Sequence, residues 1–146
     1  MMKKLTIDFL LAGGREHGRK PNEVVSVHPD DLVLAAALKL KDHKVGLVVV
    51  IKDQKLVGVL SERDVVRKWV CGRKFPQPVK VSELMTPNVE VVTPNDTVFD
   101  CYLRFIARNC RHLPVVDPLG QVLGILSMRD VTTYVINRLE EHQGKI

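Results

Sequence analysis

The feature that most constrains this chain is an internal repeat. The segment Gly58-Val59-Leu60-Ser61-Glu62-Arg63-Asp64-Val65 returns 66 positions later as Gly124-Ile125-Leu126-Ser127-Met128-Arg129-Asp130-Val131. Laying Gly46–Val65 over His112–Val131 gives nine identities in twenty positions. The chain is therefore a duplicated unit, and the repeated motif is the first place to look for function.

A second match lies upstream, where His28-Pro29-Asp30-Asp31 corresponds to Thr93-Pro94-Asn95-Asp96 at a spacing of 65. We place the one-residue difference inside the intervening helix. A period near 66 is too long for a solenoid, in which three or more units stack. We therefore expect two units that share a core about a pseudo-twofold axis.

Both repeats read as strand, helix, hairpin and helix, so the predicted fold class is α+β with two β-α-β-β-α repeats. In the first repeat we expect strands at 23–27, 47–51 and 56–60, and helices at 29–43 and 61–70. In the second we expect strands at 89–92, 113–116 and 122–126, and helices at 96–109 and 128–142. Short helical segments are also expected at 6–11 and 82–85. The predicted boundaries are an N-terminal helix and polar lead-in at 1–22, repeats at 23–72 and 89–146, and a connection at 73–88.

Periodicity also predicts which helix residues are buried. Leu32, Ala35, Ala36 and Leu40 share one side of the first helix. The stripe expected on the helix at 96–109 consists of Val98, Cys101, Tyr102, Phe105 and Ile106. Trp69 is interpreted either as a buried residue or as a contact in a dimer.

The net charge of +5 favours anionic partners and permits nucleic-acid binding. The basic residues are nevertheless dispersed, and aromatic residues make up only 5% of the chain, so no base-stacking platform is evident. A dispersed basic surface is favoured over a nucleic-acid groove. The three cysteines Cys71, Cys101 and Cys110 form no metal-ligand spacing and are odd in number, which favours a reducing cytoplasm over a disulfide framework.

Other function classes lack support in the sequence. No apolar stretch reaches membrane-spanning length, so no membrane association is expected. No nucleophile triad, paired carboxylates or metal cluster emerges, so we expect no enzyme activity, no metal and no cofactor beyond a regulatory ligand.

The repeated Ser-x-x-Asp motif has two explanations. A serine before a helix with an acid at the third helical position is close to a capping box. The alternative is a ligand site, because a helix start offers backbone N–H groups to phosphate and a carboxylate can grip ribose hydroxyls. Gly58 and Gly124, in the middle of apolar strands, favour the close approach of another group at each motif.

The order of elements and the Gly-x-x-Ser-x-x-Asp ending of both units resemble a tandem cystathionine-β-synthase (CBS) domain pair, or Bateman module. Leu113-Pro114-Val115-Val116-Asp117 and Val81-Ser82-Glu83-Leu84-Met85-Thr86 fit the same family. The likeness covers roughly Val24 to Ile136 and is closest to small stand-alone prokaryotic members.

The resemblance implies a regulatory module that binds AMP, ADP, ATP, NAD or S-adenosylmethionine in a cleft between the repeats, and a homodimer formed through helices. Carried onto this chain, one site combines Ser61, Arg63 and Asp64 with Val89–Val92 and Arg111-His112-Leu113-Pro114. The other combines Ser127, Arg129 and Asp130 with Val24-Val25 and Val45-Gly46-Leu47-Val48. Met85 and Thr86 match a segment near adenine in relatives; a hydrophobic plug before a turn is the alternative.

The repeats differ before their central strand. Arg111-His112 match a basic pair of nucleotide-binding relatives, and we align them with Val45-Gly46 of the first repeat. The site that joins Asp64 to His112 is therefore expected to bind phosphate better than the other. The alternative for His112 is a helix-end histidine that caps backbone carbonyls.

Overall fold

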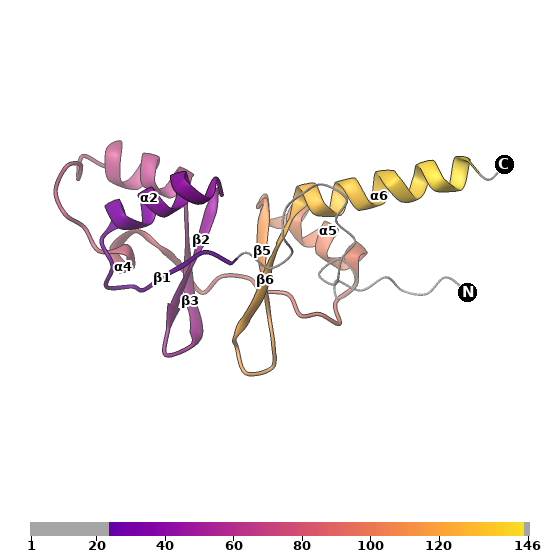
Figure 1. Ribbon diagram of the computed structural model, residues 1–146, viewed down its shortest axis with the longest axis horizontal. Coiled ribbons are helices and arrows are strands. Elements are labelled where there is room, and N and C mark those ends of the chain that lie inside the picture. Colours follow the sequence, from indigo (N-terminus) through magenta and orange to yellow (C-terminus); the bar gives the residue numbers. More distant parts are fainter. Residues whose placement is uncertain (1–23, 145–146) are drawn as a thin grey trace. The chain divides into compact units, whose positions relative to one another are not determined.

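The computed structural model of the protein describes residues 24–144, which divide into two compact units (Figure 1). The first unit comprises residues 24–90 together with 119–121, and the second comprises 91–118 and 122–144. The helix expected at 6–11 and the polar lead-in lie outside the described residues.

The first unit is built on a four-stranded sheet in the order β1-β2-β3-β4. Its strands are β1 (Ser26–Val27), β2 (Leu47–Lys52), β3 (Lys55–Ser61) and β4 (Thr86–Pro87). β1 runs parallel to β2, whereas the β2–β3 and β3–β4 pairs are antiparallel. The β2–β3 turn places Asp53 and Gln54 at φ 51 and 65, the positive angles of a tight turn that matches strand twist.

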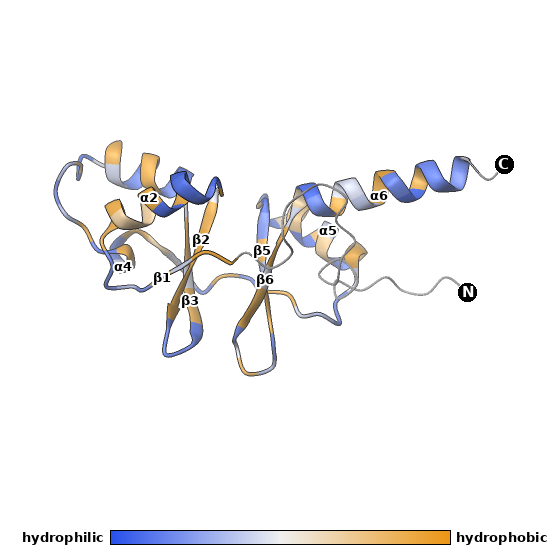
Figure 2. Cartoon of the chain, in the orientation of Figure 1, coloured by the Kyte–Doolittle hydropathy of each residue, from blue (hydrophilic) through white to orange (hydrophobic). Residues whose placement is uncertain are grey.

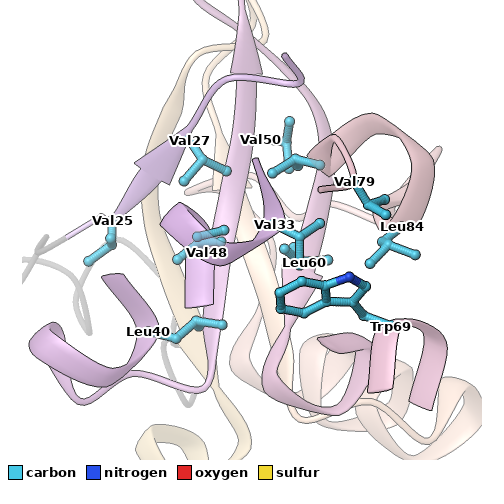
Figure 3. Close-up of a cluster of buried hydrophobic side chains, with 12 residues drawn as sticks. Val25, Val27, Val33, Leu40, Val48, Val50, Leu60, Trp69, Val79 and Leu84 are labelled. Atoms are coloured by element: carbon cyan, nitrogen blue, oxygen red, sulfur yellow. The ribbon is translucent and has the colours of Figure 1, made fainter. Parts of the chain in front are cut away.

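Helices supply the other half of the first core. They are α2 (Val33–His43), α3 (Glu62–Asp64), the π-helix η1 (Val65–Val70) and α4 (Val81–Leu84). Val48 and Val50 of β2 pack with Val33, Leu60 and Trp69 in one buried cluster (Figure 3). Trp69 is only 5% exposed, so the buried interpretation of this residue is correct. Its indole N–H donates to the Gln77 carbonyl at 3.1 Å, which satisfies the polar edge of the ring.

The second unit contains α5 (Val98–Arg108), β5 (His112–Val116), β6 (Val122–Ser127) and α6 (Met128–Gln143). β5 and β6 form an antiparallel hairpin. The predicted strand at Val89–Val92 is wrong as a strand: only Val92 forms a bridge, parallel to Val115. The core of this unit gathers residues from both helices and both strands: Val92, Val98, Cys101, Phe105, Leu113, Val115, Leu126 and Val131.

The two units repeat their local hydrogen bonds. His28 N–H donates to the Asp31 carboxylate at 2.8 Å, and Thr93 N–H to that of Asp96 at 2.9 Å. After these turns α2 and α5 run for eleven residues each and end in a left-handed residue, Lys44 at φ 54 and Asn109 at φ 49. The start and the end of this helix in the first unit each lie 65 positions before their counterparts in the second unit. Placing the one-residue difference inside this helix is therefore wrong.

The strand pairing locates the extra residue in the second hairpin turn. Val50 pairs with Gly58 in the first hairpin, and Val115 pairs with Gly124 in the second. Val50 and Val115 are 65 positions apart, whereas Gly58 and Gly124 are 66 positions apart. Residues 117–121 of the second turn replace 52–55 of the first. Val48 and Val50 therefore correspond to Leu113 and Val115, and these four residues face the cores of their units. Slipping a strand by one residue would turn this set to the opposite face.

Several predicted boundaries change for local reasons. The first strand shortens to Ser26–Val27 among the described residues, and α2 begins at Val33 instead of Pro29 because 28–31 form a hydrogen-bonded turn. α5 likewise begins at Val98, with Thr97 as its N-cap. The turn expected at Ser82–Met85 is α4, shifted to Val81–Leu84.

The predicted apolar stripes are only partly buried. Ala36 and Leu40 of the first stripe are in the core, whereas Leu32 is 47% exposed and Ala35 is also exposed. In α5, Val98, Cys101 and Phe105 are buried, but Tyr102 and Ile106 are exposed. Figure 2 shows hydrophobic residues recurring along α2, α5 and α6, so each unit retains apolar helical surface in addition to its core.

Candidate functional site

Both Ser-x-x-Asp motifs form complete capping boxes. Ser61 Oγ accepts the Asp64 N–H at 3.0 Å, and Asp64 Oδ2 accepts the Ser61 N–H at 3.0 Å. In the second unit the same two bonds join Ser127 and Asp130 at 3.0 and 3.2 Å. The structural explanation of the motif is therefore correct. It leaves room for a ligand role, because a carboxylate has a second oxygen and a serine hydroxyl can still donate its proton.

The capping boxes reduce what the helix starts can offer to an anion. The first helical amide of each motif is taken by a backbone carbonyl: Glu62 N–H by Gly46 at 3.0 Å and Met128 N–H by Arg111 at 2.8 Å. The third helical amide is taken by the serine. The second amide, of Arg63 or Arg129, is the donor left over, so recognition of phosphate would fall mainly to side chains.

These two backbone bonds also correct the alignment of the basic pair. Gly46 and Arg111 accept the equivalent helix-start amide, and Leu47 and His112 pair with the equivalent serines, Ser61 and Ser127. Arg111-His112 therefore correspond to Gly46-Leu47, not to Val45-Gly46. The difference in charge remains, because the first unit has no basic side chain at either position.

Asp64 has a second partner on the helix that it caps. Lys68 Nζ lies 3.1 Å from Asp64 Oδ1, one helical turn on, and also donates to the Leu84 carbonyl at 3.1 Å. The Asp64 side chain is 17% exposed and that of Lys68 is 44% exposed. The residue at the position of Lys68 in the second unit is Tyr134, which packs against the core and carries Arg138 over its ring.

The group that approaches Gly58 is protein. A Cβ at this position would lie 2.8 Å from Met85 Sδ and 2.9 Å from the Thr86 carbonyl oxygen. β4 pairs with β3 here, so that Gly58 lies opposite Pro87 and Val59 opposite Thr86. Met85 is half-buried and Thr86 is exposed, so both retain surface that a ligand could contact.

The remaining predicted site residues fall into two groups. Val48 and Leu113 are 0% and 1% exposed, and Pro114 is also buried, so these three could contribute to a site only through their backbone. The others retain accessible surface, the arginines more than the rest: Arg63, Arg111 and Arg129 are exposed, whereas Val24, Gly46, Leu47, Val89 and His112 are half-buried.

Among residues 24–144, no group of three or more His, Cys, Asp or Glu is arranged to hold a metal ion. No helix in this part of the chain combines the length and the apolar character needed to cross a bilayer.

Comparison with known proteins decides the family. The family model of the CBS domain matches residues 20–70 and 81–137, which is more than half of the chain and one match for each repeat. The chain belongs to the CBS-domain family. The mixed α/β fold is that of solved CBS-domain structures: one is 38% identical, with a TM-score of 0.78 over 90% of this chain and 97% of that one.

Two further comparisons place this CBS-domain chain among its relatives. CBSX2, solved in complex with AMP, is 28% identical, with a TM-score of 0.72 over 91% of this chain and 97% of that one. An uncharacterized protein of Methanopyrus kandleri is 29% identical over 127 residues, which cover 84% of this chain. The chain spans 65% of the length of that archaeal relative.

Sequence reasoning missed Lys68. The sequence carries a signal for it, because a basic residue one helical turn after an acid is a recognisable ion-pair spacing. The contrast between Lys68 and Tyr134 is also visible in the sequence, once the spacing of 66 is applied.

Proposed function

We propose that this CBS pair is a regulatory, ligand-sensing module whose ligand is an adenine nucleotide, with AMP as the best candidate. The observation that carries the proposal is the AMP complex of CBSX2, which shares the fold over nearly the whole of both chains. ADP, ATP, NAD and S-adenosylmethionine remain members of the same ligand class. CBS pairs are generally regulatory, and no catalytic family is indicated for this chain.

Each predicted residue has a role that its surroundings permit. Asp64 and Asp130 would accept ribose hydroxyls on the carboxylate oxygen that the capping box leaves available. The serine hydroxyls would donate to the ligand, and Met85 and Thr86 would lie near the base. Arg111 and His112 would bind phosphate, because two of the first three helix-start amides in each unit are already bonded.

The proposal is tested by calorimetric titration of the full chain with AMP. We expect Asp64→Ala to abolish AMP binding and Asp130→Ala to leave it nearly unchanged, because the basic pair is predicted to share a ligand with Asp64. The opposite pattern would contradict the assignment of the stronger site. Absence of binding by the native chain to AMP, ADP, ATP, NAD and S-adenosylmethionine would reject the function itself.

We also propose that the chain forms a homodimer through its helices and transmits ligand binding to a partner as a change in packing. A ligand can shift such an equilibrium only by binding one state more tightly. Equivalent helix positions expose large apolar side chains in both units: Leu34 and Phe99 are 54% and 67% exposed, and Leu38 and Leu103 are 46% and 47% exposed. A cytoplasmic location is proposed because the three cysteines, an odd number, favour a reducing compartment over a disulfide framework.

Nucleic-acid binding remains the second candidate, because several arginines and lysines on the exposed surface have no acidic partner in the described part of the chain, Arg63 and Arg111 among them. Such binding would weaken steeply with salt. This candidate would be ruled out if the chain bound AMP with an affinity that does not depend on salt and bound neither DNA nor RNA.

A further inference from the structure

We infer that Lys68 makes the Asp64 motif selective for a phosphorylated ligand, whereas Tyr134 leaves the Asp130 motif with no such preference. The inference rests on the proposed function, since it concerns which adenosine compounds the two motifs accept. The difference between the two motifs cannot come from their Ser and Asp residues, which are the same in both repeats.

The first step is the position of the ammonium group. Lys68 Nζ is 3.1 Å from Asp64 Oδ1, the carboxylate oxygen that the capping box does not use, and 3.1 Å from the Leu84 carbonyl oxygen. A lysine ammonium has three N–H donors, so these contacts leave one without a protein partner among the described residues. A group that binds the Asp64 carboxylate is therefore within reach of a cation that can still donate.

The second step is the chemistry of that pair. A carboxylate beside an ammonium matches a ligand that carries hydroxyl donors next to an anionic group, as a ribose 5′-phosphate does. Lys68 is partly open to solvent and Asp64 largely enclosed, which allows the cation to turn toward a phosphate while the carboxylate stays in its capping box. A lysine suits this role because it acts on phosphate as a compact point charge.

The third step is the contrast with the second unit. Asp130 is held by the same capping box, but Tyr134, which has no ammonium group, lies one turn later. Because Tyr134 packs against the core of its unit, it has less freedom to reach a ligand than Lys68. The motif around Asp130 can still accept ribose hydroxyls, but Tyr134 gives it no added affinity for a phosphate group.

The selectivity is tested by measuring the affinities of AMP and adenosine for the full chain and for Lys68→Met by calorimetry. We expect the variant to bind AMP about tenfold or more weakly at the Asp64 site, as expected for loss of a charge-assisted hydrogen bond, with adenosine affinity unchanged. Lys68→Arg keeps the charge and should retain most of the preference for AMP. Lys41→Met is the matched control, because Lys41 is a 73% exposed lysine of the same unit whose partner is Asp42.

The outcomes separate the two proposals. If the native chain binds neither compound, the proposed function fails and the selectivity falls with it. If the native chain binds both equally, or if Lys68→Met weakens AMP and adenosine by the same factor, the function stands and the role of Lys68 is refuted. Thermal melting of each variant without ligand shows whether it is folded.

Discussion

At the scale of single residues, Gly58 is required by backbone packing within the first unit. A Cβ added here would lie 2.8 Å from Met85 Sδ and 2.9 Å from the Thr86 carbonyl oxygen, so the space that a side chain needs is already occupied. The methionine can move, but the carbonyl belongs to the β3–β4 pairing and cannot shift without breaking it.

Gly58→Ala is therefore expected to destabilise the protein by about 1–3 kcal/mol, as overpacking of a dense interior does. Thermal or urea unfolding followed by circular dichroism measures the effect. Gly144→Ala is the control, because a Cβ there meets nothing closer than 3.5 Å. A Gly58→Ala protein as stable as the native chain would show that β4 adjusts freely.

Cys101 is a core residue whose thiol is chemically protected. It is fully buried, and burial, assisted by the negative charge of Asp96, raises the pKa of the Cys101 thiol from 9.0 to about 11. Since the thiolate is the reactive form, iodoacetamide is expected to label the exposed Cys71 and to leave Cys101 unmodified until the chain unfolds. Mass spectrometry of peptides from native and denatured samples locates the label.

The same shift in pKa has a defined effect on stability. The folded-state pKa is the higher one, so the contribution of Cys101 to the free energy of unfolding is present below pH 9 and is lost as the pH rises toward 11. We expect Cys101→Ala to show a shallower loss of stability across this interval than the native chain. Parallel curves for the two proteins would contradict the shift.

At the scale of elements, the duplicated capping boxes stabilise helices of unequal length. α6 runs for 16 residues, whereas the helix after Ser61 is three residues of α3 followed by six residues of η1. In η1 the Cys71 N–H donates to the Val66 carbonyl, five residues back, which is the wider hydrogen bond of a π-helix.

Ser61→Ala and Ser127→Ala are each expected to cost about 0.5–2 kcal/mol without any ligand, because each removes the acceptor for one helix-start amide. Denaturant unfolding in nucleotide-free buffer measures both. Ser→Thr at the same positions keeps the acceptor and serves as the control. If both alanine variants were as stable as the native chain, the serines would be kept for ligand binding alone.

Long side chains at one helix position tie the helix to the segment that precedes it in both units. Lys39 Nζ donates to the Ser26 carbonyl at 2.8 Å, and Arg104 Nη1 donates to the Val91 carbonyl at 3.1 Å. The two donors are 65 positions apart in the sequence, and so are the two acceptors. Part of the positive charge of this chain therefore serves its own fold. This weakens the argument from net charge to nucleic-acid binding.

At the scale of the whole molecule, the exposed apolar helix positions are the basis of the proposed homodimer. Introducing a charge at equivalent positions, as in Leu38→Glu and Leu103→Glu, is expected to shift the protein to a monomer, because an unpaired charge cannot be buried cheaply in an apolar contact. Sedimentation velocity measures the mass, and Lys41→Glu on α2 tests for a general effect of charge. A dimer that survives both glutamates would place the interface elsewhere.

The sequence by itself determined that the chain is duplicated, that each repeat contains a helix, a hairpin and a second helix, and that the family is CBS. These properties depend on local patterns and on a motif repeated with its neighbours. It could not determine the strand register. The runs at 47–51 and 113–116 share three identities at a spacing of 66 and only one at 65, yet 65 is the spacing that the packed strands have. Only packing of alternate residues into each core distinguishes the two alignments.

The same division applies to the candidate site. The Ser-x-x-Asp pairs and Arg111-His112 were found in the sequence, because the residue types and their spacing carry the signal. That the first helix-start amides bond to Gly46 and Arg111, that Gly58 faces Met85, and that Lys68 reaches the Leu84 carbonyl were decided by tertiary structure. These contacts join residues distant in the chain, and their distances follow from how strands and helices pack, which a linear pattern does not contain.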